Sequence, residues 1–153
     1  MRYWVLAIVV SIFASAVASQ VNADRKPAAG YIVTANSGVQ YLNGGIGDDS
    51  RREVNQIAHE RNFNVKLVFA WRTGNFVSDI PVIIDDAEGN KVLALERSDP
   101  LLLLRLPPGH YTARAEYNGA TVSHAFKAPE TGMKVVPFVW QKPDDSEGLA
   151  PRE

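Results

Sequence analysis

The sequence predicts an all-β domain, a seven-stranded antiparallel β-sandwich preceded by one short α-helix. Three observations carry this prediction. The spacing of apolar residues changes from helical to strictly alternating near residue 63. Turn signals then recur at short intervals as far as residue 140, which is typical of short strands in a sandwich. The pair Asn118-Gly119, flanked by alternating apolar residues, is a strong signal for a two-residue β-hairpin.

The composition is that of a globular protein and excludes several functional classes. The 153 residues are 46% apolar and 22% charged, with 16 Lys and Arg against 17 Asp and Glu. Without a surplus of cations the chain is not expected to bind nucleic acid or to attach to an anionic membrane through a polybasic segment. The absence of cysteine excludes disulfides, thiolate metal sites and a cysteine nucleophile.

The first segment is typical of a secretory signal peptide over residues 1–18. Arg2 is followed by an uncharged run from Val5 to Ala18, which ends in the small-x-small pattern Ala16-Val17-Ala18. A second such pattern ends at Ala23, so cleavage after residue 23 is the alternative. The run is shorter than the about 20 apolar residues that a membrane-spanning helix needs. We therefore expect a periplasmic or secreted protein with no stable membrane span after signal removal.

Residues 19–47 are predicted as a flexible leader and a glycine-rich loop, with Tyr31-Ile32-Val33 as a candidate short strand. Residues 48–62 are predicted as the helix, since apolar side chains from Val54 onward follow helical spacing. Ser50 to Glu53 match a capping box, and the acidic residues before them favour a helix N-terminus.

The predicted sandwich covers residues 63–141, and the polar residues 142–153 are predicted as a disordered tail. The seven predicted strands are Val65 to Trp71, Val77 to Asp85, Lys91 to Glu96, Leu101 to Leu106, His110 to Tyr117, Ala120 to Lys127 and Met133 to Trp140. The Asn118-Gly119 turn also predicts a register, in which the inward face is apolar. Its expected pairs are Tyr117 with Ala120, Ala115 with Val122, Ala113 with His124 and Tyr111 with Phe126.

Three local patterns in this region resemble the carboxypeptidase regulatory-like family. They are the strand, turn and return strand over residues 80–92, the Leu-Pro-Pro-Gly-His-Tyr segment over 106–111, and the hairpin turn after Tyr117. The resemblance covers roughly residues 64–140 and implies a seven-stranded sandwich of the transthyretin (prealbumin-like) kind. The Gly-Gly-Ile-Gly-Asp-Asp segment and the following helix are similar to exported proteobacterial proteins of this group. Such modules accompany enzymes, receptors and surface proteins and carry no catalytic apparatus. The structural motif consists of Pro107, Pro108, Gly109, Tyr111, Asn118 and Gly119.

Neither a metal centre nor an active site is expected from the remaining polar residues. The acidic turn Asp85 to Asn90 lacks the alternating ligand spacing of an EF-hand, so we interpret it as a hairpin turn. His59 lies on the predicted helix, and His110 and His124 lie on opposite faces of one hairpin. No nucleophile motif is present, and two carboxylates brought together by the fold would be the remaining catalytic arrangement. No cofactor is expected.

Two sets of side chains are candidates for binding. Ile83, Leu101 and Leu103 are expected on outward faces, where either the helix or a partner must cover them. Trp71, Phe76 and Trp140 either pack in the core or stack on sugar rings near a sandwich edge. The expected function is a noncatalytic interaction module whose partner is an envelope protein or a second copy, and the alternative is a carbohydrate-binding module.

Overall fold

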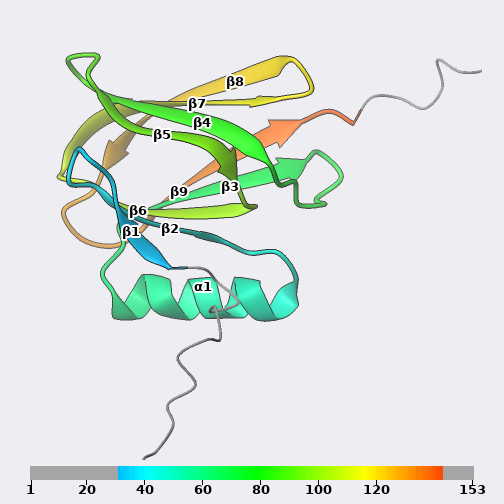
Figure 1. Cartoon of the computed structure of the whole chain (residues 1–153), viewed down its shortest axis with the longest axis horizontal. Helices are drawn as coiled ribbons and strands as arrows, with labels where there is room; N and C mark the ends of the chain where they lie inside the picture. The colour runs from blue at the N-terminus through cyan, green and yellow to red at the C-terminus, as the bar shows by residue number, and fades with distance from the viewer. Residues whose placement is uncertain (1–30, 143–153) are drawn as a thin grey trace, which may run out of the picture.

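The computed structural model describes residues 31–142, and in it two β-sheets stack face to face with one helix against the outer face of the first (Figure 1). The predicted signal peptide (1–18, or to 23), residues 19–30 of the leader and residues 143–153 of the tail lie outside the described residues.

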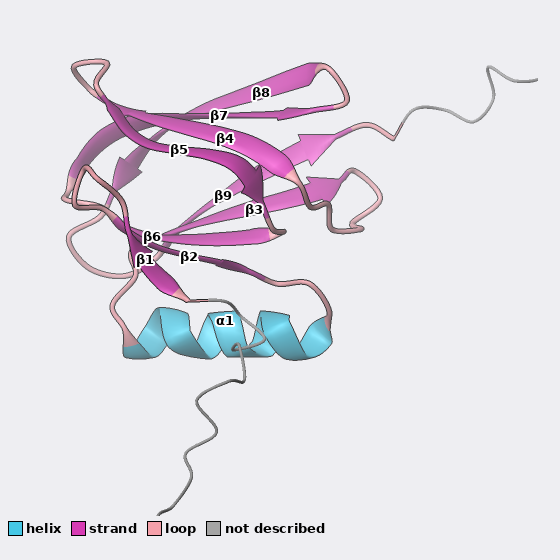
Figure 2. Ribbon diagram, viewed as in Figure 1, coloured by secondary structure: helices cyan, strands magenta, loops and turns pink. Residues whose placement is uncertain are grey.

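The first sheet, sheet A, has five strands and the second, sheet B, has four (Figure 2). All neighbouring strands are antiparallel except β3 and β9, which run parallel. Sheet A has the order β1 (Ile32–Thr34), β2 (Gln40–Gly44), β6 (Leu101–Arg105), β3 (Val65–Trp71) and β9 (Lys134–Trp140). Sheet B has the order β5 (Lys91–Ser98), β4 (Ile80–Asp86), β7 (Gly109–Tyr117) and β8 (Ala120–Ala128).

The described residues form nine strands, so the predicted count of seven is wrong. The seven predicted strands are present as β3 to β9, and β1 confirms the candidate short strand at Tyr31-Ile32-Val33 with its bounds shifted by one residue, so only β2 is additional. The loop predicted up to residue 47 is in fact a strand over Gln40–Gly44, because pairing with β6 and burial of Leu42 outweigh the glycine-rich composition. The sandwich is also not entirely antiparallel, since the first and last of the seven predicted strands pair in parallel.

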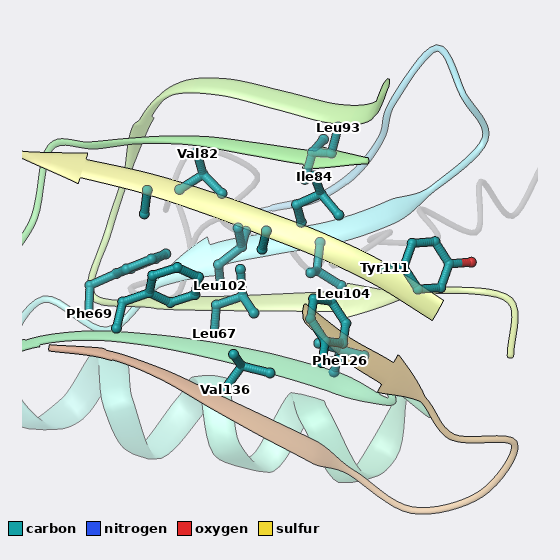
Figure 3. Close-up of a cluster of buried hydrophobic side chains, with 14 of the residues drawn as sticks. Leu67, Phe69, Val82, Ile84, Leu93, Leu102, Leu104, Tyr111, Phe126 and Val136 are labelled. Atoms are coloured by element: carbon teal, nitrogen blue, oxygen red, sulfur yellow. The ribbon is translucent and has the colours of Figure 1, made fainter. Parts of the chain in front are cut away.

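The main core lies between the two sheets and is built from the alternating inward residues of both (Figure 3). Phe69 of β3 and Phe138 of β9 are completely buried there, with ring centroids 5.4 Å apart. The hairpin register predicted from Asn118-Gly119 is confirmed at all four pairs. Asn118 and Gly119 have φ values of 48° and 76°, which the type I′ turn requires.

Helix α1 (Asp48–Glu60) confirms the predicted location but not the predicted cap. Gly47 is the N-cap residue, and no side chain caps the helix. The Ser50 hydroxyl is buried and accepts a hydrogen bond from the Gly45 N–H at 2.8 Å, so it orders the incoming loop instead. Gly45 has φ 99° and a Cβ there would lie 2.7 Å from Leu101 Cγ, so only glycine fits.

Two asparagines close the ends of the sandwich with hydrogen bonds to backbone groups. Asn64, just before β3, donates to the carbonyls of Leu106 and Pro129 at 2.8 and 2.9 Å and accepts from the Leu106 N–H at 2.9 Å. Asn43 of β2 accepts from the Asp99 N–H at 2.7 Å, where the chain crosses from sheet B to sheet A. Each side chain thereby forms hydrogen bonds with backbone groups that have no partner in a neighbouring strand.

Tyr111 fixes the turn that follows the two prolines. Its ring is 8% exposed and stacks on Phe126, and its hydroxyl donates to the Pro107 carbonyl at 2.9 Å. A hydrogen bond from a tyrosine to the chain a few residues upstream is the arrangement of a tyrosine corner, which recurs in β-sandwiches.

We predict that Tyr111→Ala lowers the free energy of unfolding by about 3–5 kcal/mol, because a buried ring is lost. Tyr111→Phe removes only the hydrogen bond and should cost about 0.5–1.5 kcal/mol. Urea unfolding measures both values, and Tyr31→Phe at an exposed position is the control. A loss below about 1 kcal/mol for Tyr111→Ala would contradict the burial of the ring.

We predict a loss of about 2–4 kcal/mol for Asn64→Ala, since up to three backbone groups lose their partner at once. Asn55→Ala on the exposed surface of α1 is the matched control and should change stability little. Equal effects of the two substitutions in urea unfolding would show that the Asn64 hydrogen bonds do not hold the sandwich together.

Candidate functional site

The predicted interaction surface of Ile83, Leu101 and Leu103 is not formed. Leu101 and Leu103 are buried beneath α1, where they pack with Val54 and Ala58. Ile83 is half-buried in β4 of the other sheet. Alternation correctly predicted that the two leucines point away from the main core, and of the two expected covers, the helix or a partner, the helix is the one observed.

The three aromatic residues proposed for sugar stacking do not share a face. Trp140 is 4% exposed, and its indole N–H donates to the Ala120 carbonyl at 2.9 Å. Trp71, its partner across β3 and β9, is half-buried and meets Tyr117 edge to face. Phe76 is exposed but pairs with Ala70, whose side chain lies on the opposite face of β3 from Trp71. Of the two expected roles, Trp140 therefore packs in the core, and Trp71 packs against the edge of the core.

The acidic turn between β4 and β5 holds its carboxylates in internal contacts. Asp86 accepts hydrogen bonds from the N–H groups of Asn90 and Glu88 at 2.8 and 3.0 Å, and Asp85 forms an ion pair with Arg114. The Asn90 N–H, followed by the other turn contacts, lowers the pKa of Asp86 below its ordinary value. Burial, and then the charges of Asp86 and Glu88, raise the pKa of the nearby Tyr111.

The histidines do not form a site within the described residues. His59 and His110 are exposed on α1 and on the outer face of β7, and His124 is half-buried with its ring 4.9 Å from that of Phe138. Across residues 31–142 no three His, Asp or Glu side chains come together in a way that could hold a metal ion.

An exposed apolar area lies on the outer face of sheet A, beside the helix. Of the seven exposed large hydrophobic residues in the described part of the chain, four lie there or at its border. They are Ile46 (64% exposed), Phe76 (42%), Val135 (46%) and Val139 (45%). The helix lies against β2 and β6, and Val68 of β3 packs against the cluster beneath it, whereas the outward residues of β9 are exposed beyond the helix (Figure 2).

Strand registers connect these side chains into one surface. Val139 lies beside Ala70, and Ala70 lies beside Phe76, so the three form a row across the sheet. A second row joins Pro137 to Val68. We call this surface the β9 face, which consists of Val68, Ala70, Phe76, Val135, Pro137 and Val139.

Positive charge borders the β9 face on its helix side. The Arg51 guanidinium lies 4.8 Å from the centre of the Phe76 ring, a cation–π distance. Arg51, Phe76 and Ile46 also line a pocket of about 350 Å³ at the start of α1. Lys66 projects from β3 and donates to the Asn55 side chain at 3.1 Å. The sequence analysis did not identify this site, which could have been found from the run Val135 to Trp140, apolar on both faces of the strand.

A scan against protein-family models and a search of curated proteins both find no match for this chain. Within residues 31–142, the single helix is too short and too polar to span a membrane.

We predict that Asp86→Ala destabilises the protein at neutral pH and that this effect disappears in acid. The folded-state pKa lies below the unfolded value of about 3.9, so the stabilisation is complete above that value. It is lost as the pH falls through the folded-state pKa. Urea unfolding at several pH values measures the difference, with Glu116→Ala on the exposed face of β7 as control. A calcium-dependent rise in melting temperature would contradict our interpretation of this turn.

Proposed function

We propose that this chain is an exported, noncatalytic interaction module of the carboxypeptidase regulatory-like, transthyretin-like kind, and that its β9 face binds a protein of the cell envelope. The family assignment is supported by the arrangement of β3 to β9. Within this set β6, β3 and β9 belong to sheet A, and β5, β4, β7 and β8 form sheet B, so the seven strands supply both layers of a sandwich. The remaining elements β1, β2 and α1 all belong to or pack on sheet A. Export is supported by the single N-terminal cation and the short apolar run that follows it.

The observation that carries the interaction role is the exposed apolar surface of β9. An outward sheet face in a soluble domain normally carries polar side chains. Here Val135, Pro137 and Val139 occupy consecutive outward positions and are all exposed. Contiguous exposed apolar patches of this kind mark interaction sites.

The border of the β9 face indicates the chemistry of the partner. Arg51 and Lys66 lie on the helix side of the patch. A partner surface with a central apolar side chain and carboxylates at its rim would bury the valines and pair with Lys66, while Arg51 already forms an ion pair with Asp48. A second class of ligand, carbohydrate, is the less favoured candidate, because the three aromatic residues expected to stack on sugars do not share a face.

We predict that the mature chain captures a stoichiometric protein when cross-linked in its native cell envelope, and that Val135→Glu with Val139→Glu abolishes this capture. The glutamates place charge in the centre of the apolar contact. The control is Ala94→Glu, an exposed alanine on the outer face of sheet B. Mass spectrometry identifies the cross-linked residues and also reports whether the chain begins at Ser19 or Asp24.

Capture that survives the double substitution would contradict the β9 face as the binding site. Loss of capture in Ala94→Glu as well would show that the effect is not specific to that face. Binding of oligosaccharides that quenches tryptophan fluorescence, together with no protein capture, would replace the proposal with the carbohydrate alternative.

A further inference from the structure

Each sheet of the described domain has two edge strands, and three of the four carry features that oppose pairing with another chain. An edge strand exposes unpaired backbone groups and is a template for strand addition unless it is protected. β1 is only three residues long. The other two protected edges are β9 and β5, and the remaining edge is β8.

β9 is protected by Pro137. The N–H of Lys134 donates to the Asn64 carbonyl, and the carbonyl of Trp140 accepts from the Arg72 N–H. The N–H and C=O groups of the even-numbered residues of β9 therefore point toward β3. The odd-numbered residues therefore direct theirs outward. Pro137 is the central one of these and has no N–H to donate, which is where proline is found on edge strands.

β5 is protected by the hairpin of β1 and β2. The Ser37 hydroxyl donates to the Val92 carbonyl, and the Asn43 side chain donates to the Arg97 carbonyl at 3.4 Å. These two hydrogen bonds occupy outward acceptors near both ends of the strand. The pairing of β5 with β4 is also irregular in two places, which distorts the edge further.

β8 has none of these features. It runs for nine residues in unbroken register with β7, contains no proline, and carries one residue that is always charged, Lys127. Tyr117 and Ala120 flank the two-residue turn and form a hydrogen-bonded pair, so the even-numbered residues of β8 bond to β7. The N–H and C=O groups that point outward belong to Thr121, Ser123, Ala125 and Lys127.

The core is also open along β8. Inward residues of the neighbouring strand β7 are fully covered, with Ala113 at 0% and Ala115 at 1% exposure. Val122 and His124, their register partners on β8, face the same interior but are only half-buried. A further strand beside β8 would cover both side chains.

We propose that β8 pairs antiparallel with β8 of a second copy about a two-fold axis at His124, joining two copies of sheet B into one continuous sheet. His124 is the midpoint of the strand, so this register overlaps the two strands completely. It places Ser123 opposite Ala125 in a hydrogen-bonded pair, because both residues direct their backbone outward.

The same strand complements itself in this register. Lys127 lies opposite Thr121 rather than opposite another lysine, so no lysines face each other. On the inner face Val122 lies opposite Phe126 on either side of the axis, and His124 lies opposite its own copy on the axis. A two-fold axis makes the contact isologous and closed, which favours a dimer over a growing fibre.

The solution mass of the full mature chain tests this dimer. We expect light scattering to show twice the chain mass for the wild type and for Ala94→Pro, and a single chain mass for Ala125→Pro. Both alanines are exposed on edge strands of sheet B. Ser123→Lys is a second variant that brings like charges together near the axis, in case the proline prevents folding as judged by circular dichroism.

Amide hydrogen exchange gives an independent measurement. In the dimer the amides of Ser123, Ala125 and Lys127 should exchange slowly, and those of Val135 and Val139 should remain fast. A monomeric wild type would overturn the proposal, and so would a dimer that persists in both Ala125→Pro and Ser123→Lys. Slow exchange at β8 in a monomer would show that a segment of the same chain covers the strand.

This dimer does not depend on the proposed function, since the two use different surfaces. Val135→Glu with Val139→Glu should keep the dimer mass while losing the captured protein. Ala125→Pro should lose the dimer mass and retain the β9 face.

Discussion

The four consecutive leucines of β6 impose the layered architecture of this domain. Leu101, Leu102, Leu103 and Leu104 are between 0% and 4% exposed, although successive strand residues point to opposite faces. Their burial therefore requires cover on both sides of sheet A. Sheet B covers two of them and α1 covers the other two. Burying one leucine side chain contributes about 1.5–3 kcal/mol to stability. The two leucines beneath α1 therefore stabilise the packing of the helix against sheet A.

Polar side chains then close the places where the layers meet. Asn64 joins the start of β3 to the end of β6 and to the connection before β9. Asn43 joins β2 to the crossover after β5. Every buried side-chain polar atom in the described residues has a hydrogen-bond partner. Such closure matters because an unpaired buried polar group costs about 1–3 kcal/mol, which is a large part of the net stability of a domain.

Local signals predicted most of the elements, and long-range pairing produced what they missed. The correctly located elements, β3 to β9 and α1, all have a signal in their own few residues: alternation, helical spacing or the Asn118-Gly119 turn. β2 is a strand because β6 lies beside it, which no local pattern reveals. For Leu101 and Leu103 the outward orientation was predicted correctly, and of the two expected covers, the helix or a partner, the structure shows the helix. Alternation could have revealed the β9 face, because Val135 and Val139 are apolar at positions opposite to Val136 and Phe138.

The two sides of the sandwich differ in a way that links both proposals. On one side the β1–β2 hairpin contacts the edge of β5 through Ser37 and Asn43. On the other side β8 and β9 meet through His124 with Phe138 and Trp140 with Ala120, and no described segment covers their edges. A dimer through β8 would hold two β9 faces in one assembly. Binding of one partner site would then raise the effective concentration of the second, so a weak contact at each face would give strong attachment to a surface that displays several copies of the partner.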